Sequence, residues 1–414
     1  MSLHRRFYTL ILCVVMLFGE VPVVNGQRIG FHLEGNRRRV KIPIEIHNNL
    51  IVVEVVVNDV LPLKFILDTG VRSNILVDKY YTDLLGVNYS RMITLYGLGR
   101  ELSVNAYIAS NVKLKMPGVT ATGQAILVLE TDLLQFRNYL GVDIHGIIGY
   151  EIFSRFVVGI DYSSEVLTLY DPAHFKKRKK YQTVDLDVID TKPYIDLHVL
   201  LNDTTSMNAK LMIDTGASHA LVLNKDSDER INIPEKNIRA KLGRGLTGDI
   251  EGNLGRAKAL EISDYRLNDV IVSYPDTEMY LDTLLYAHRN GSIGGEILRK
   301  FDLVFDYSSR KLYLKKNFKF KQPFEYNMSG LEVVADGRNL DKFKIEDVRE
   351  GSPAALAGVL PGDQITDINE LSQERLSLSR IFNILNAKEG KRITMSVDRN
   401  NRKLKFRFFL HREI

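Results

Sequence analysis

The chain repeats itself once, and this duplication limits the possible folds more than any other feature. The segment FILDTGVRSNILV, centred on Asp68, returns as LMIDTGASHALVL around Asp214, with an offset of 214 − 68 = 146 residues. Three more landmarks return in the same order: YGLG as LGRG, GIIGYEIFSRF as GSIGGEILRKF, and IDYSSEVLTLY as FDYSSRKLYLK. We therefore expect two copies of one structural unit, related by pseudo-two-fold symmetry.

Both copies have the sequence pattern of β structure. They are rich in Val, Ile, Leu, Tyr and Phe, and alternating stretches such as IPIEI and KLYLK are separated by Gly, Asn and Asp turns. The segments VVEVVVND, ending at Asp59, and HVLLND, ending at Asp203, predict a hairpin turn before each central motif. Segments with a helical period are few, so the sequence predicts a mainly β fold.

The charge balance and the cysteine count exclude several kinds of function. Lys and Arg total 56 against 51 Asp and Glu, and a net charge of +5 gives no reason to expect a nucleic-acid partner. The single cysteine, Cys13, excludes a disulfide framework and a Cys-based zinc cluster, and the nine histidines are scattered. We expect neither a metal nor another cofactor.

A basic run, KKRKK, lies between the two copies at residues 176–180. We interpret it as a solvated linker, and the alternative is a contact with an anionic partner. Aromatic residues do not alternate with the basic ones, which again disfavours nucleic-acid binding.

The amino terminus has the pattern of an export signal. Basic residues at positions 4–6 precede the apolar run LILCVVMLF, and Gly26 provides a small residue near a cleavage point. The run is shorter than the roughly 20 residues that span a bilayer, although an uncleaved anchor is the alternative. The sequence predicts a secreted or periplasmic protein. Residues 27–41, with a basic run at 37–39, are either a removable pro-segment or a leading strand.

Two carboxyl groups placed close together can hydrolyse a peptide bond without a metal. Repulsion between them keeps one protonated and one ionised, which supplies an acid and a base from identical residues. One Asp from each copy, Asp68 and Asp214, would form such a pair. Supporting roles are expected for the residues that follow each of them: the hydroxyls can hydrogen bond across the lobes and the glycines allow close backbone approach, at Thr69, Gly70, Thr215 and Gly216.

These motifs resemble the aspartic proteases, both pepsin-like and retropepsin-like, over about residues 42 to 316. IIG at 147–149 fits the apolar-apolar-Gly segment of that family, and SIG at 292–294 fits it less well. The resemblance implies an aspartic endopeptidase acting on peptides or unfolded proteins. The rival interpretation is a catalytically silent protein that binds peptides in the same cleft.

The family resemblance also implies a hairpin flap over the cleft from each lobe. The candidate flap residues are Tyr96, Gly97, Gly99, Gly243 and Gly245. The residues directly after the triplets, Val71 and Ala217, stand where pepsin-like enzymes usually carry Ser or Thr. Without those hydroxyl donors the pair should work at weaker acidity than pepsin does. Arg72 could select acidic substrate groups or pair with a local carboxylate.

A different signature follows the repeat. GLEVV at 330–334 and GSPAALAGVLPGDQITDIN at 351–369 resemble a PDZ domain of the type found on bacterial envelope proteases. The resemblance implies a loop that receives a peptide carboxylate and a helix that lines the groove for an added strand. The residues concerned are Gly330, Leu331, Glu332 and Val333 in the loop, and Leu378 and Ile381 on the helix. The alternative is a packing module that binds no tail.

The predicted architecture is therefore two pseudo-symmetric β-barrel lobes followed by a small α+β PDZ domain. Expected partners are a peptide or unfolded-protein substrate and a C-terminal peptide ligand, with membrane contact only through an uncleaved signal. The predicted boundaries are 1–26 for the signal, 27–41 for the extension, 42–175 for lobe 1, 176–192 for the basic linker, 193–320 for lobe 2 and 326–414 for the PDZ domain.

Overall fold

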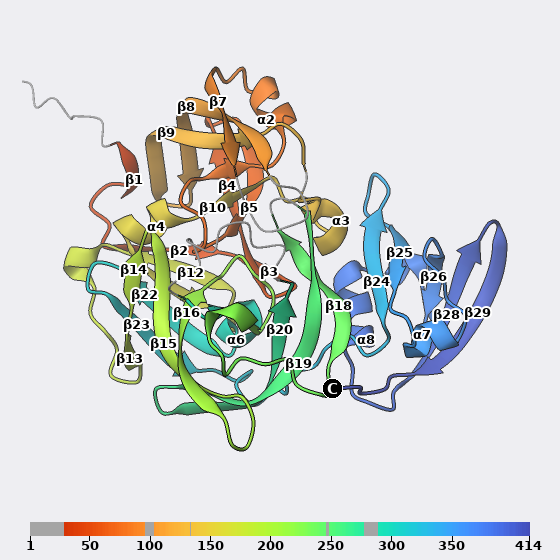
Figure 1. The fold of residues 1–414 in the computed structure, drawn as a ribbon. Helices are drawn as coiled ribbons and strands as arrows, with labels where there is room; N and C mark the ends of the chain where they lie inside the picture. Colours follow the sequence, from red (N-terminus) through yellow and green to blue (C-terminus); the bar gives the residue numbers. More distant parts are fainter. Residues whose placement is uncertain (1–28, 96–102, 133, 246–247, 277–288) are drawn as a thin grey trace, which may run out of the picture.

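A computed structural model describes residues 29–95, 103–132, 134–245, 248–276 and 289–414. Figure 1 shows two β-rich lobes and a separate, smaller domain that lies beside them at the carboxyl-terminal end. This arrangement confirms the expected mainly β fold, with two lobes followed by a PDZ domain. None of the described helices is long and apolar enough to cross a membrane.

Lobe 1 is built on a sheet in the order β1-β9-β6-β10-β5-β4-β8-β7, with β3 paired to β4. Its elements are β1 (Gly30–Leu33), β3 (Glu45–His47), β4 (Leu50–Val57), β5 (Leu61–Leu67), β6 (Ile75–Leu76), α2 (Lys79–Leu84), β7 (Tyr89–Leu95), β8 (Val104–Met116), β9 (Val119–Leu129), α3 (Phe136–Leu140), β10 (Gly146–Ile148) and α4 (Tyr150–Arg155). Asn58 and Asp59, with φ of 52° and 58°, form the tight turn between β4 and β5 that the sequence predicts.

Lobe 2 repeats this pattern in the order β14-β15-β16-β21-β17-β20-β19-β18. Its elements are β14 (Asp187–Ile189), β15 (Lys192–Leu200), β16 (Ser206–Ile213), β17 (Leu221–Leu223), η2 (Lys225–Ser227), β18 (Ile238–Gly245), β19 (Gly248–Ile262), β20 (Tyr265–Pro275), β21 (Gly291–Ile293) and α6 (Gly295–Leu298). The turn between β15 and β16 is longer than its counterpart in lobe 1, and within it the Asn202 side chain accepts hydrogen bonds from the backbone N–H groups of Thr204 and Thr205.

A third sheet joins the lobes, in the order β13-β23-β22-β11-β12-β2. It contains β2 (Arg39–Pro43), β11 (Val157–Asp161), β12 (Val166–Tyr170), β13 (Gln182–Asp185), β22 (Phe301–Asp306) and β23 (Lys311–Lys316), with η1 (Pro172–His174) after β12. Residues at the amino-terminal extension thus form two strands, β1 paired with β9 and β2 paired with β12. The predicted basic linker, residues 176–192, contains two strands, β13 and β14.

The carboxyl-terminal domain has the sheet order β24-β25-β26-β28-β29, with β27 paired to β26. Its elements are β24 (Leu331–Asp336), β25 (Lys342–Val348), α7 (Pro353–Leu356), β26 (Gln364–Ile368), β27 (Leu371–Ser372), η4 (Gln373–Arg375), α8 (Leu378–Leu385), β28 (Arg392–Arg399) and β29 (Arg402–Phe409). Ser352 caps α7 and Ser377 caps α8 through their hydroxyls. β24 lies at the edge of this sheet and pairs with β25.

Candidate active site

Each lobe presents its Asp at the end of a central strand. β5 leads into Asp68, whose backbone N–H donates to the carbonyl of Ile148 at 2.8 Å. β16 leads into Asp214 in the same way, and its N–H donates to the carbonyl of Ile293 at 2.9 Å. In both lobes the strand before the Asp runs parallel to the short strand that supplies this carbonyl, β10 or β21. The repeat therefore brings the two aspartates to equivalent places at the lobe interface.

The threonines of the two triplets hydrogen bond across the interface. The backbone N–H of Thr69 donates to Thr215 Oγ1, and the N–H of Thr215 donates to Thr69 Oγ1, both at 3.0 Å. The hydroxyl of Thr69 donates to the carbonyl of Ile213 at 2.6 Å, and that of Thr215 donates to Leu67 at 2.8 Å. Both threonines are buried, at 1% and 0% exposure. Four reciprocal hydrogen bonds in a buried interface fix the distance between the two Asp loops.

The triplet glycines let the carboxyl groups approach each other. The N–H of Gly70 donates to Asp68 Oδ1 at 2.6 Å, and the N–H of Gly216 donates to Asp214 Oδ1 at 3.0 Å. A Cβ atom at Gly216 would lie 2.2 Å from the carboxyl carbon of Asp68, which is inside the van der Waals limit. A Cβ atom at Gly70 would lie 3.0 Å from Asp68 Oδ1 and 3.5 Å from Asp214 Oδ1, so the two carboxyl groups lie side by side. Only glycine at position 216 leaves room for this contact.

Burial and charge repulsion favour a proton on the pair of carboxyl groups. Burial, and then the negative charge of Asp214, raise the pKa of Asp68 well above its ordinary value. The Gly70 N–H and the ammonium group of Lys192 act in the opposite direction but do not prevent the rise. Two coupled carboxyls in such surroundings retain one proton between them at mild acidity.

Three further residues near the pair did not emerge from the sequence. Burial lowers the pKa of Lys192, at the start of β15, although the charges of both aspartates favour its protonated form. His219 has its Nε2 3.1 Å from Ser292 Oγ, and burial lowers the pKa of its imidazole. Burial and the charge of Asp68 raise the pKa of Tyr307. Two sequence features could have indicated these residues. Tyr307 lies in the repeated DYSS landmark, and the Ser of SIG, which contacts His219, stands where lobe 1 has Ile.

Arg72 takes the second of its two predicted roles. Its Nη2 lies 2.7 Å from Asp190 Oδ1, in the turn between β14 and β15. Both side chains are more than half exposed, at 67% and 62%. The guanidinium group is thus held by a local carboxylate in lobe 2.

The two predicted flaps are described to different extents. Tyr96, Gly97 and Gly99 lie outside the described residues. Gly243 and Gly245 lie at the end of β18, in the long antiparallel hairpin that β18 forms with β19. The pairing shifts register between Lys241 and Gly243, and Gly243 has a φ of 152°. This irregularity, in which glycine avoids strain, bends the strand near the hairpin tip.

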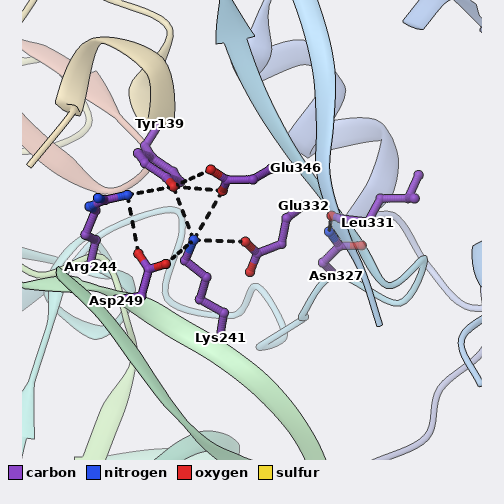
Figure 2. A network of polar contacts seen from close by, with 8 residues as sticks. All are labelled: Tyr139, Lys241, Arg244, Asp249, Asn327, Leu331, Glu332 and Glu346. Atoms are coloured by element: carbon purple, nitrogen blue, oxygen red, sulfur yellow. Dashed lines mark hydrogen bonds and ion pairs between the residues drawn. The ribbon is translucent and has the colours of Figure 1, made fainter. Parts of the chain in front are cut away.

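The hairpin of lobe 2 is tied to lobe 1 and to the PDZ domain by one polar network. Figure 2 shows its members, which come from α3, β18, β19, β24 and β25: Tyr139, Lys241, Arg244, Asp249, Glu332 and Glu346. Lys241 Nζ lies 3.1 Å from Asp249, 3.4 Å from Glu332 and 3.2 Å from Glu346. The side chain of Lys241 is only 15% exposed.

Charge and burial oppose each other within this network. Burial would lower the pKa of Lys241, but the carboxylates, with Glu332 foremost, raise it above its ordinary value. Burial raises the pKa of Glu332 to about 7, against the attraction of Lys241. The Tyr139 hydroxyl donates to both carboxylate oxygens of Glu346 at 2.7 Å and accepts from Arg244 at 2.9 Å. The network thus couples three segments that are distant in the sequence.

The predicted PDZ groove is covered by lobe 1. Four of its predicted residues, Leu331, Val333, Leu378 and Ile381, are buried, with exposures of 3% or less. Gly330 has a φ of 80° and lies against Ser352, and Glu332 belongs to the network above. α3 packs on β24: Asn138 Nδ2 donates to the carbonyl of Ala335 at 2.8 Å, and Gly141 lies against Leu378. An acceptor on the edge strand is therefore already occupied by a side chain of this chain.

The two β lobes and the paired carboxyls at their interface have the architecture of an aspartic protease. Comparison with known families matches the aspartyl protease family over residues 53–152 and 198–294. The PDZ domain family matches residues 344–399, which include α8 but begin after the predicted carboxylate loop. The chain therefore carries an aspartyl protease domain in two segments and a carboxyl-terminal PDZ domain. A search of curated proteins finds no match to this chain.

Among the parts of the chain that the structure describes, no group of three or more His, Cys, Asp or Glu side chains is arranged to hold a metal ion.

Proposed function

We propose that this protein is an active aspartic endopeptidase that cleaves peptide bonds with a water molecule activated by Asp68 and Asp214. The observation that carries the proposal is the contact between the two carboxyl groups, held by the reciprocal hydrogen bonds of Thr69 and Thr215. A protein that only bound peptides would not need two carboxyls sharing a proton, because one of them must then stay protonated at a cost in free energy.

Because the two carboxyls share one proton, one acts as the base and the other as the acid. The ionised carboxyl takes a proton from water as the water oxygen attacks the peptide carbonyl carbon. The protonated carboxyl gives its proton to the carbonyl oxygen, which leaves a neutral tetrahedral diol. Collapse of the diol breaks the C–N bond: the leaving nitrogen takes the proton held by the first carboxyl, while the second recovers one from a hydroxyl of the diol.

The test uses unfolded casein and the chain without residues 1–26, assayed across pH. Asp68→Asn and Asp214→Asn should each abolish cleavage, and the double variant should lose no more than either single one, because the pair acts as one unit. Asp190→Asn, which removes an exposed carboxyl near the same loops, is the matched control and should keep full activity. Measurable turnover by either dyad variant, with wild-type thermal melting, would remove the dyad from the mechanism, and absence of cleavage by the wild type would support the silent peptide-binding alternative.

We further propose that the PDZ domain binds the tail of a substrate or partner in exchange for α3. A strand added to β24 needs the carbonyl of Ala335, which Asn138 now occupies. Because Tyr139 of α3 also contacts Arg244 and Lys241, displacement of α3 would reach the lobe 2 hairpin. Asn138→Ala should strengthen binding of a C-terminal peptide library selected on the full chain, and unchanged binding would contradict the exchange.

The amino-terminal pattern supports export, and we propose a secreted or periplasmic location. Expression of the full chain in a bacterial host, followed by amino-terminal sequencing of the exported protein, tests this. Cleavage near Gly26 is expected, and retention of residues 1–26 on a cytoplasmic product would contradict the proposal.

A further inference from the structure

Two basic runs that are distant in the sequence meet on one face of the sheet between the lobes. Arg38, Arg39 and Lys41 belong to or precede β2, and the other run follows η1. Pairing of β12 with β2 sets Tyr170 opposite Arg39, and the N–H of Asp171 donates to the carbonyl of Arg38 at 2.9 Å. The chain after β12 therefore runs alongside the first run. The second run then supplies Lys176, Lys177 and Arg178.

A cavity of about 440 Å³ lies between these two runs. Its floor includes Gly159, Thr168 and Tyr170, which point away from the core because side chains alternate along β11 and β12. A Cβ atom at Gly159 would lie 3.3 Å from the Tyr170 ring, so glycine keeps the floor open. Phe175 packs between Tyr170 and Tyr313, with ring centroids 5.3 and 5.7 Å away, and forms one wall.

The cations around this cavity lack acidic partners. Six lining residues carry a permanent positive charge, and Asp161 is the single acidic residue in the lining. Asp161 Oδ1 accepts from the N–H groups of Ser163 and Ser164, and nearby Asp171 is engaged with His174. Within the described ranges no ion pair involves any of the six, although Lys177 donates to Thr183 at 2.8 Å.

Other cations on the same face of the sheet do have acidic partners. Lys311 and Lys315, on β23, are each paired with a carboxylate, Asp185 and Asp302 respectively. The local excess around the cavity is five charges, six cations against one carboxylate, and equals the net charge of +5 of the whole chain. Gathering unpaired like charges lowers stability, which an anionic ligand would offset.

We propose that this cavity is a binding site for a molecule that carries two or more phosphate or sulfate groups. Arginine and lysine side chains converging from two walls suit the oxygens of such groups, and the volume suits a small or branched anionic ligand. The site is separate from the paired aspartates, because it lies on the outer face of the sheet, whose inner face carries the buried Val158 and Leu169. The basic run at 176–180 is then part of a site and no longer a plain linker.

The test is calorimetric titration of the full chain without residues 1–26 with tripolyphosphate at several salt concentrations. Binding that weakens steadily with salt is expected. One variant changes Lys176, Lys177 and Arg178 to Gln, in a segment outside the sheets. A second changes Arg39 and Lys41 to Gln, in the other run. Each should weaken binding by about tenfold or more, since several charge-assisted hydrogen bonds are lost.

The matched control changes Arg402, Lys403 and Lys405 to Gln, exposed cations on β29 in the PDZ domain. It removes the same charge as the first variant but should alter affinity by less than about twofold. Equal losses in the control, or an effect of one basic run without the other, would overturn the proposal. Vesicles of phosphatidylcholine with and without phosphatidylinositol phosphate separate a lipid headgroup from a free ligand. Failure of both tripolyphosphate and these vesicles to bind would also overturn it.

The outcome is independent of the proteolytic assay. None of the substituted cations touches the paired aspartates, so casein cleavage by these variants should match the wild type. A variant that loses phosphate binding but keeps cleavage separates this site from the proposed active site.

Discussion

The hydroxyl of Thr215 makes two hydrogen bonds that join the lobes, and Thr215→Val removes both with little change of shape. The buried N–H of Thr69 loses its acceptor and the carbonyl of Leu67 loses its donor. Each unsatisfied buried group costs about 1–3 kcal/mol, so the free energy of unfolding should fall by about 2–6 kcal/mol. That is a large part of the roughly 5–15 kcal/mol that stabilises an ordinary domain.

The matched control is Thr215→Ser, which keeps both hydrogen bonds and loses one buried methyl group, at about 1 kcal/mol. Urea unfolding followed by far-ultraviolet circular dichroism compares the two variants. Valine keeps the methyl group and serine keeps the hydroxyl, so Thr215→Val should be less stable than Thr215→Ser by about 1–5 kcal/mol. If Thr215→Val is as stable as Thr215→Ser to within about 1 kcal/mol, these hydrogen bonds do not hold the lobes as we argue.

Three other expectations follow from the same contacts. Gly216→Ala should lower kcat about a hundredfold or more with a smaller change in KM, because the new Cβ would displace the carboxyl of Asp68; a near-wild-type kcat would refute this. Because the pKa of Asp68 is raised, the pair should keep its proton to higher pH than in pepsin-like enzymes, and activity should persist to higher pH as well. Val71→Ser should move the pH profile toward acid, and a wild-type optimum confined to strong acid would contradict this expectation. Lys241→Met should speed amide hydrogen exchange in α3 and β24, whereas Lys258→Met, which breaks an exposed ion pair, should not. Equal effects of the two variants would show that the network does not hold the domains together.

The raised pKa of Asp68 also has a consequence for stability, and its sign is opposite to that of a salt-bridged carboxylate. The folded state binds this proton more tightly than the unfolded chain, whose Asp titrates near pH 4. Stability should therefore be highest below that pH and fall as pH rises toward the folded pKa. Asp68→Asn should remove this fall, and urea titrations of wild type and variant at several pH values measure it. Parallel pH dependence in the two proteins would contradict the raised pKa.

The duplicated sequence by itself determined the two-lobed fold and the identity of the paired aspartates. A repeat with one central Asp in each copy places the two residues at equivalent positions about a pseudo-two-fold axis, and the threonines beside them follow by the same symmetry. The alternation of apolar residues determined the strands, and the tight turn at Asn58 and Asp59 followed from local turn preferences. These properties depend on neighbours in the chain or on the repeat itself.

Contacts between distant segments were decided only by the tertiary structure. The sequence left two roles open for Arg72, and packing of the lobes chose Asp190. It left open whether the PDZ domain binds a tail or serves as a packing module, whereas the structure shows that α3, about 200 residues earlier in the chain, covers the edge of β24 through Asn138. It left the run at 176–180 as either a linker or an anionic contact, because no local pattern shows that β2 will lie beside β12. Periodicity reports which face of a strand is buried, but the partner that covers that face is set by how whole sheets pack, and this information is spread over the entire chain.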